Sequence, residues 1–388
     1  MLKRPDSLNL SNWRQPPHNR WAFHHVREII PTAPIYRGNK SSGFTSTPVP
    51  ALNELMLSGL EDSQWSLDRW LAESSSDALL VAHRGQLMHE WYFDSEIEFN
   101  PHIVFSVSKS ITAILAGVLV DQGLLDPAKP VVDYIPELAD SGYRDASLQQ
   151  VLDMVVRIDF AEDYLATSGK FVEYRSATAW HPCGVDEIDQ NLHGFLCSLE
   201  RSEGDHGEVW QYKSPNSDLL GWVLERVSGE PLAQLMSRHL WQPMGAEKNA
   251  YITVDRKGAP RTAGGICVIP RDLLRFGELV RNRGVANGQQ VIPDWWIDDC
   301  SQGGNRDAWQ RGESSKEFTD GRYRNKWYQT GNEHQVMLAI GIHSQWIYIN
   351  PVTEVTIVKL SSQDQPLRPD LDDINLRAFT SISAAVSG

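Results

Sequence analysis

The stretch "FSVSKSITAILAGVLVDQG", residues 105–123, constrains the fold most, because a serine and a lysine stand where a long apolar run begins. Such a run predicts a buried helix that starts near Ser106. Lys109 then lies about one turn later on the same face, so its Nζ can reach the Ser106 Oγ. The alternative is a solvated lysine on an ordinary core helix.

The spacing matters because a serine hydroxyl is a weak nucleophile until a base removes its proton. An ordinary lysine, with a pKa of about 10.4, is already protonated at neutral pH. Burial disfavours the ammonium and can leave a lysine neutral near pH 7. A helix N-terminus also favours the negative charge that develops on the serine oxygen. We therefore expect Ser106 to be a catalytic nucleophile and Lys109 its base.

Charge and cysteine usage exclude several classes of protein. The 388 residues carry a formal net charge of −14 with no strongly basic stretch, which argues against nucleic acid and anionic membranes as partners. No window of 18 apolar residues exists, and the first residues lack the apolar core of a signal peptide. The four cysteines form no C-x-x-C pair, and no H-E-x-x-H occurs. We expect a cytoplasmic protein with no metal and no cofactor.

The chain divides into recognisable segments. We expect an irregular surface arm over residues 1–60 that includes His24 and His25, and long pocket loops over 159–207. Apolar runs on either side of Arg84-Gly85 predict a hairpin over 77–93. Helices are predicted over Ser147–Ile158, Asn216–Gly229 and Pro270–Gly284, and two strands joined at Asn350-Pro351 over Gln335–Ser362.

A second constellation, "WQYKSPNSDLLGW", offers Tyr212, Ser214 and Asn216 just before a helix. It resembles the second motif of serine penicillin-recognising enzymes, which is Tyr-x-Asn in one branch and Ser-x-Asn in another. Tyr212-Lys213-Ser214 fits the first branch in part, and Ser214-Pro215-Asn216 fits the second literally. A tyrosine hydroxyl here can relay a proton between lysine and leaving group. The alternative is a packing aromatic followed by capping residues.

The third motif of those enzymes lies on a strand edge, often as Lys-Thr-Gly, which this chain lacks. The best candidate is "AIGIHSQ", aligned on Gly341. The backbone N–H of Ile342 would then join that of the nucleophile as an oxyanion hole. The Thr-Gly of "YQTGN", residues 328–332, ranks second because no clear strand is predicted after it. His343, next to Ile342, is expected to line the site.

Taken together, these motifs resemble those of the class C β-lactamase-like serine hydrolases, and within them the nylon-oligomer hydrolases and their carboxylesterase relatives. The resemblance spans about residues 12–362 and is carried by "WRQPPHNRWAF", "SVSKS", "VLVDQG", "VLDM", "EDY", "ITVD", "TGNE", "AIGIHSQ" and "VTIVKLSS". It implies an α/β penicillin-recognising fold. An antiparallel sheet flanked by helices would come from residues 1–105 and 250–388, and a mainly helical domain from 106–249. The site would lie at their interface.

By this resemblance, Tyr212 matches the proton relay, and the amides of Ser106 and Ile342 match the oxyanion hole. Tyr164 and Trp180 match aromatic residues that close over bound substrate. The chain departs from the amide-cleaving members at two places. They carry an Asp where this chain has Tyr174 or Arg175, and an Asn where it has Ala263. These departures put 6-aminohexanoate oligomers in doubt as substrates.

The sequence thus predicts a serine hydrolase that cleaves small carboxylic esters or amides through an acyl-enzyme on Ser106, with Ser214, Gly341, His343, Tyr164 and Trp180 contacting substrate. The alternatives are a β-lactamase or D-alanyl peptidase, and an inactive module that binds an acyl ligand. The absence of G-x-S-x-G argues against an α/β-hydrolase. A homodimer is allowed by the sequence but not required by it.

Overall fold

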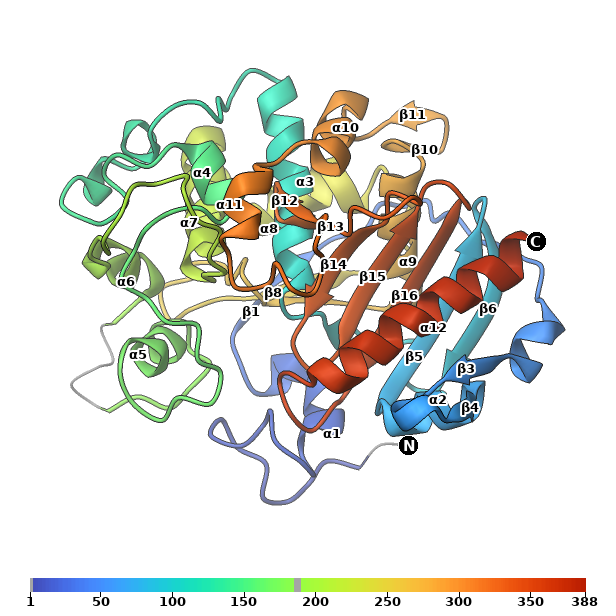
Figure 1. The fold of residues 1–388 in the computed structure, drawn as a ribbon. Coiled ribbons are helices and arrows are strands. Elements are labelled where there is room, and N and C mark those ends of the chain that lie inside the picture. Colours follow the sequence, from blue (N-terminus) through green and yellow to red (C-terminus); the bar gives the residue numbers. More distant parts are fainter. Residues whose placement is uncertain (1–2, 185–189) are drawn as a thin grey trace.

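A computed structural model describes residues 3–184 and 190–388. Its main feature is a sheet of eight strands in the order β12-β13-β14-β15-β16-β5-β6-β2 (Figure 1). Neighbouring strands are antiparallel except β2 and β6, which are parallel. In that order the strands are Arg322–Arg324, Trp327–Gln329, Met337–Gly341, Gln345–Asn350, Val355–Ser361, Ser76–His83, Gln86–Tyr92 and Thr45–Ser46.

Both termini contribute to this sheet, as the sequence predicts. The hairpin of β5 and β6 turns at Arg84 and Gly85, which both have positive φ. α12 (Pro369–Ser387) crosses one face of the sheet, and α9 (Pro270–Arg281) packs on the other (Figure 1). The central strands are therefore covered on both faces, which explains why β5, β15 and β16 are buried along nearly their whole length.

The remaining strands are short. A second sheet has the order β1-β8-β9-β7, and two hairpins pair β3 with β4 and β10 with β11. Their bounds are Thr32–Ile35, Ala250–Thr253, Ile266–Val268 and His102–Ile103 for the second sheet, then Met56–Ser58, Gln64–Ser66, Val285–Ala286 and Gln289–Gln290.

Helices dominate the middle of the chain. Every named element between residues 106 and 249 in the described part is a helix or a helical turn. The helices not yet given are α1 (Asn19–Phe23), α2 (Leu67–Glu73), α3 (Val107–Asp121), α4 (Leu148–Leu152), α5 (Lys170–Ala177), α6 (Leu192–Ser198), α7 (Pro215–Ser228), α8 (Leu232–Met236), α10 (Asp294–Gln302) and α11 (Arg306–Gln310). The division into two domains stays a proposal.

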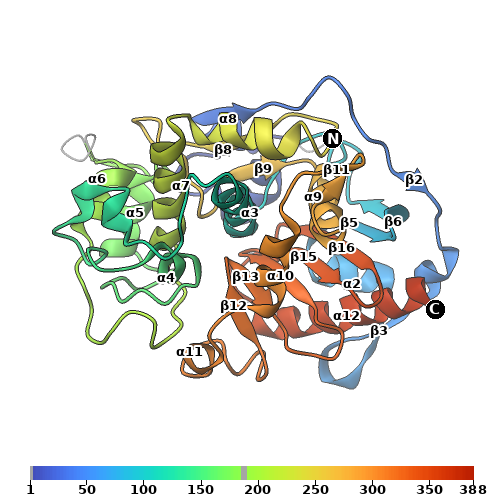
Figure 2. The ribbon, with the colours of Figure 1, turned by 90° about the horizontal axis from the view of Figure 1, so that it is seen from above.

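The position of α3 explains where a site can form. Figure 2 shows α3 between the group of α4 to α7 and the large sheet. It contacts α7 on one side and β14 and β15 on the other. Its side chains are buried almost all round, since only its last turn reaches solvent. No helix in the described ranges has both the length and the apolar character needed to cross a membrane.

Four local predictions are corrected. The helix at Ser147 has the expected cap but ends at Leu152, because the chain turns through a positive φ at Met154. Residues 335–362 form three strands, with an additional turn between Gly341 and Gln345. The loops over 159–207 contain α5 and α6.

The fourth correction concerns the N-terminal arm, which does not stay on the surface. Trp13, Trp21 and Phe23 are buried in one cluster with Phe105 and Trp180. His24 is buried as well, contrary to the prediction. The arm therefore reaches the start of α3 and forms part of its surroundings.

Candidate active site

Ser106 and Lys109 lie at the buried N-terminus of α3, where the sequence predicts a nucleophile and its base. The Lys109 Nζ donates a hydrogen bond to the Ser106 Oγ over 2.7 Å. Ser106 occupies the N-cap position, but its side chain makes no capping bond, so the hydroxyl remains available to the lysine. Ser106 is 9% exposed and Lys109 only 1%, so the serine opens toward solvent and the lysine does not.

Burial changes the acidity of Lys109 as the mechanism requires. Desolvation lowers the pKa of this lysine to about 7, the Arg261 charge acts in the same direction, and Glu162 and Asp218 oppose it. A substantial fraction of Lys109 is therefore neutral at pH 7 and can accept a proton. The Ala263 carbonyl also accepts a hydrogen bond from Nζ over 2.6 Å, which fixes the amine beside the serine.

The Ala263 peptide is held in turn by Asp218 on α7. Its N–H donates to the Asp218 Oδ1 over 2.8 Å. The second carboxylate oxygen accepts hydrogen bonds from Arg261 and from the Tyr174 hydroxyl. Asp218 and Arg261 are both buried, so each charge needs the other. This pair positions the carbonyl that orients Lys109, and it accounts for the buried position of Tyr174.

Tyr212 stands just before α7 and lies beside both Ser106 and Lys109. Burial strongly raises the pKa of its hydroxyl, and the interaction with Ser106 partly offsets this shift. The Lys109 Nζ lies 4.9 Å from the centroid of the Tyr212 ring. Tyr212 therefore stays protonated at neutral pH and can pass a proton on.

Gly341, at the end of β14, lies against the backbone of Ser106. A Cβ added there would come within 3.1 Å of the Ser106 nitrogen and 2.6 Å of the Val104 carbonyl oxygen, so only glycine fits. Within the described residues, neither the Ser106 nor the Ile342 N–H has a hydrogen-bond acceptor. Phe105 has a positive φ of 41°, a conformation that costs energy for a side chain of this size. The arrangement leaves two amides free beside the nucleophile.

Ser214 is tied to a carboxylate that the sequence analysis did not single out. Its N–H and hydroxyl donate to the two oxygens of Glu162 over 2.8 and 2.6 Å. Glu162 also supplies the largest charge effect on Lys109. Ser214 therefore lies in the site, but its hydroxyl is already engaged.

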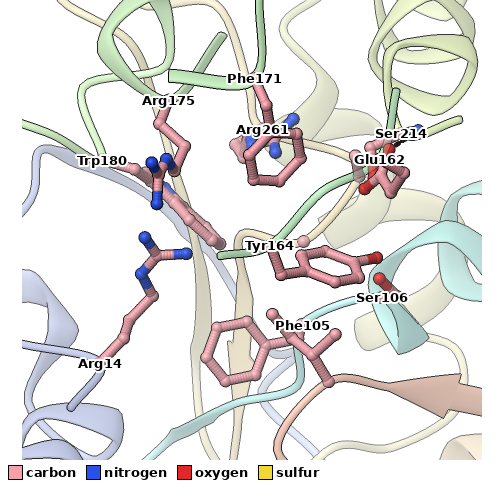
Figure 3. A pocket seen from close by; sticks show the side chains of 13 residues that line it. Arg14, Phe105, Ser106, Glu162, Tyr164, Phe171, Arg175, Trp180, Ser214 and Arg261 are labelled. Atoms are coloured by element: carbon pink, nitrogen blue, oxygen red, sulfur yellow. Dashed lines mark hydrogen bonds between the residues drawn. The ribbon is translucent and has the colours of Figure 1, made fainter. Parts of the chain in front are cut away.

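The cavity at Ser106 has two arms. The wide arm has a free volume of about 650 Å3 and carries several carboxylates, among them Glu313, Glu317 and Asp372. The narrow arm has a free volume of about 20 Å3 and is shown in Figure 3. Ser106, Tyr164 and Ile342 border both arms, Tyr212 and Gly341 border the wide arm, and Trp180, Arg175, Arg14 and Ala263 border the narrow arm.

The predicted aromatic residues thus reach the cavity, and so does one of the two residues at the first departure. Tyr164 and Trp180 line the narrow arm, and the Trp180 indole N–H donates to the Thr253 hydroxyl over 3.0 Å. Of the two alternatives at the first departure, Arg175 faces the narrow arm, while Tyr174 is fully buried beside Asp218.

His343 does not line either arm and is corrected as a substrate contact. Its Nδ1 is 2.7 Å from the Gln363 carbonyl oxygen, and its ring packs against Phe23 and Phe105. Burial lowers the His343 pKa to about 4, so the ring stays neutral. The His343 ring packs against the Phe105 ring and helps to hold it in place.

One buried group contains side chains that can ligate metals. Ligand atoms of His24, Asp77 and His102 lie within 4.8 Å of one another. The Arg20 Nε lies 2.9 Å from the Asp77 Oδ1, so the Asp77 charge is already paired. Because all three side chains are buried, this cluster is a structural contact between the N-terminal segment and β5.

Sequence reasoning missed four residues of the site: Arg14, Glu162, Asp218 and Arg261. Arg261 lies in none of the quoted motifs, whereas Arg14, Glu162 and Asp218 lie inside quoted segments but were not singled out. Asp218 stands two residues after Asn216 of the second motif, and Glu162 opens the "EDY" segment. Their closeness in sequence to these motifs was the feature from which Asp218 and Glu162 could have been predicted.

Comparisons with known proteins agree with this geometry. The sequence matches the β-lactamase family over residues 68–381. It is 36% identical over 357 residues to the 6-aminohexanoate-dimer hydrolase of Paenarthrobacter ureafaciens, covering 92% of this chain and 88% of that protein.

Solved structures show the same fold. A Bacillus anthracis protein proposed to be a 6-aminohexanoate-dimer hydrolase superposes with a TM-score of 0.90 at 24% identity, covering 100% of this chain and 99% of the other. A class C β-lactamase superposes with a TM-score of 0.58 at 15% identity, covering 81% and 94%. The predicted α/β penicillin-recognising fold is confirmed.

Proposed function

This chain belongs to the β-lactamase family of serine hydrolases, and we propose that it cleaves small carboxylic esters and amides through an acyl-enzyme on Ser106. The observation that carries the proposal is the 2.7 Å contact between the Lys109 Nζ and the Ser106 Oγ at the floor of an open cavity. A base in hydrogen-bond reach of a serine, with a pKa near the working pH, is what nucleophilic catalysis requires.

The steps follow from the contacts. Neutral Lys109 accepts the Ser106 proton as Oγ attacks the carbonyl carbon of the substrate. The resulting oxyanion accepts hydrogen bonds from the free amides of Ser106 and Ile342. Tyr212 transfers a proton from the Lys109 ammonium to the leaving alkoxide or amine, and the acyl-enzyme forms. Water then attacks the acyl carbon with Lys109 as base, which releases the acid and restores the serine.

The relative from Paenarthrobacter ureafaciens is named for the 6-aminohexanoate dimer, and we propose that this chain handles that dimer less well than short esters. The dimer carries an ammonium at the end of its acyl half. Arg175 faces the narrow arm and would repel it, and the Ala263 methyl group offers no hydrogen bond there. An ester also needs less help from the proton relay, because an alkoxide leaves more readily than an amine.

The matching prediction concerns these two positions. The double variant Arg175→Asp/Ala263→Asn should hydrolyse the linear dimer at least about tenfold faster in kcat/KM than the unmodified enzyme, a change worth about 1.4 kcal/mol. Chromatography of released 6-aminohexanoate measures it. Arg226→Asp, an exposed arginine on α7, is the matched control. A wild-type enzyme that prefers the dimer to every short ester would contradict this account of the narrow arm.

The function itself is tested with a panel of p-nitrophenyl esters, the linear dimer and nitrocefin, using wild type and Ser106→Ala. We expect ester hydrolysis in wild type only, together with an acyl-sized mass increase after rapid mixing. Rapid turnover of nitrocefin in place of esters would instead indicate a β-lactamase. Ligand binding without turnover of any compound would indicate an inactive acyl-binding module.

We also propose the cytoplasm as the compartment. All four cysteines, at positions 183, 197, 267 and 300, are free thiols. Such a state is ordinary in a reducing compartment.

A further inference from the structure

Two arginines from distant parts of the chain face the narrow arm. Arg14 comes from the N-terminal arm and Arg175 from α5. In Figure 3 their guanidinium groups point toward one another beside the Trp180 indole. Burial lowers the pKa of Arg14 to about 9, and the nearby charges of Arg175 and Arg261 act in the same direction. Arginine side chains keep their charge at neutral pH. Like charges placed together need a counter-charge.

Carboxylates lie nearby, but none in the described residues forms an ion pair with either arginine. Neither arginine has an ion pair within 4 Å among the described residues, whereas Arg261 beside them is paired with Asp218. Arg175 is 8% exposed; its Nη2 donates to the Ala166 carbonyl over 2.5 Å, but its Nε has no partner. A buried donor without an acceptor is unfavourable.

The nearby carboxylates are already engaged. Glu162, which lines the same arm, accepts from Ser214 with both oxygens. Asp163, the acid that acts on the Arg175 pKa, accepts from the Leu165 N–H over 2.9 Å. The free donors therefore point to an anion that comes from outside the protein.

The position of Tyr212 indicates which half of a substrate enters the narrow arm. Tyr212 borders the wide arm and not the narrow one. A group that protonates the leaving group must lie beside it, so the leaving group occupies the wide arm. The acyl group then points into the narrow arm, between the rings of Phe105, Phe171 and Trp180. A free volume of about 20 Å3 holds only one or two waters, which favours a small terminal group.

We propose that Arg14 and Arg175 form a carboxylate site for the acyl group, so that the preferred substrates are half-esters or half-amides of short dicarboxylic acids. A carboxylate accepts paired hydrogen bonds from guanidinium donors and would neutralise both arginines. This proposal rests on the proposed function, since it assigns the acyl group of the same reaction.

The test compares isosteric ester pairs by ethanol release. Monoethyl succinate is paired with ethyl 4-methylpentanoate, and monoethyl glutarate with ethyl 5-methylhexanoate, because an isopropyl group has the shape of a carboxylate without its charge. In wild type we expect kcat/KM for at least one half-ester to exceed that of its isostere by about tenfold or more. Added salt should reduce this ratio.

Arg14→Met and Arg175→Met should each lower the ratio at least about tenfold, and Arg175→Lys should restore part of it. Arg226→Met, an exposed change of the same kind, should leave the ratio as in wild type. A wild-type preference for the neutral isostere at both lengths, or a ratio that neither substitution changes, would overturn the proposal.

Binding to Ser106→Ala separates this inference from the proposed function. Calorimetric titration of that variant should show tighter binding of the better half-ester than of its isostere, and Arg175→Met in the same background should abolish the difference. If wild type hydrolyses neither ester while this difference persists, the proposed function fails and the carboxylate site stands. If esters are hydrolysed but no binding difference is found, the carboxylate site fails alone.

Discussion

Among the described residues, two serines that border the wide arm contact a buried lysine, and only one of them has the further groups that the proposed reaction needs. Lys359 also donates to the Ser361 Oγ over 2.6 Å, away from the cavity. The Lys109 Nζ lies 2.7 Å from the Ser106 Oγ, and the Lys359 Nζ lies 3.1 Å from the Ser344 Oγ. Burial lowers the pKa of both lysines to about 7. Ser106 and Ser344 both border the wide arm. A lysine that can become neutral beside a serine is therefore not sufficient to make that serine a nucleophile.

The difference lies in what else surrounds each hydroxyl. The Ser344 Oγ accepts from the Trp346 indole over 3.1 Å and from the Asn375 amide over 3.0 Å, in addition to Lys359. The Ser344 oxygen therefore accepts hydrogen bonds from three donors, which fix its position. Ser106 stands at a helix N-terminus with the unpaired amides of Ser106 and Ile342 beside it. The comparison indicates that free donors for the oxyanion, together with a hydroxyl held by one amine rather than by three donors, distinguish a nucleophile from a structural serine.

The strongest test of this difference is to remove the amines of Lys109 and Lys359 one at a time. Lys109→Met should lower kcat by about 10³-fold or more, because it removes the amine that is hydrogen-bonded to the Ser106 Oγ. Lys109→Arg should fall similarly, since arginine keeps the charge but cannot become neutral. Steady-state ester hydrolysis measures both. Lys359→Met is the matched control, and an equal loss there would remove the distinction between the two lysines.

The second largest effect is expected at Tyr212, whose hydroxyl lies beside Ser106 and has no counterpart among the described contacts of Ser344. Tyr212→Phe removes the hydroxyl that relays the proton and should lower kcat by about 10²-fold for amides, with a smaller loss for esters. The ratio of the two losses is the useful measurement. Equal losses would mean that Tyr212 positions Ser106 without transferring a proton to the leaving group.

A third prediction uses the pH dependence of acylation. Because neutral Lys109 is the base and its pKa is about 7, the rate should rise with pH through that value and then level off. Glu162 raises this pKa, so Glu162→Gln should move the midpoint to lower pH. Stopped-flow acylation across pH 5–9, roughly the range in which such a group titrates, follows the shift. Glu317→Gln in the wide arm is the control, and an unmoved midpoint in Glu162→Gln would contradict the assignment.

The smallest effect on catalysis is expected at the second serine. Ser344→Ala should change kcat by less than about threefold, which is within ordinary mutational scatter. It removes the acceptor for three buried donors and should lower the free energy of unfolding by about 1–3 kcal/mol. Urea denaturation measures the second quantity. A variant with normal stability and strongly reduced kcat would place Ser344 in the reaction.

The contact between Ser106 and Lys109 could be predicted from the sequence because its geometry is local. Ser106 and Lys109 lie three residues apart on one helix, so the spacing alone brings them together. Likewise the Arg84-Gly85 turn is encoded in its own residues. Arg14 and Asp218 could not be found this way, because their positions depend on packing between segments distant in the chain.

The missed turn after Gly341 has a physical reason as well. His343 and Ser344 both adopt positive φ, which residues of these types seldom do and which no glycine or proline announces. The apolar run therefore suggested one continuous strand. In the same way, the N-terminal segment containing His24 has the polar composition of a surface segment, but its residues Trp21 and Phe23 are buried in a cluster with Phe105.

The most direct test of the central claim is the site of covalent labelling. Wild type is treated with an alkyl fluorophosphonate, digested and mapped by tandem mass spectrometry. We expect one phosphonyl group on Ser106, none on Ser344, and loss of labelling in Lys109→Met but not in Lys359→Met. A label on Ser344 or on another serine, or an unlabelled active enzyme, would contradict the assignment of Ser106 as nucleophile.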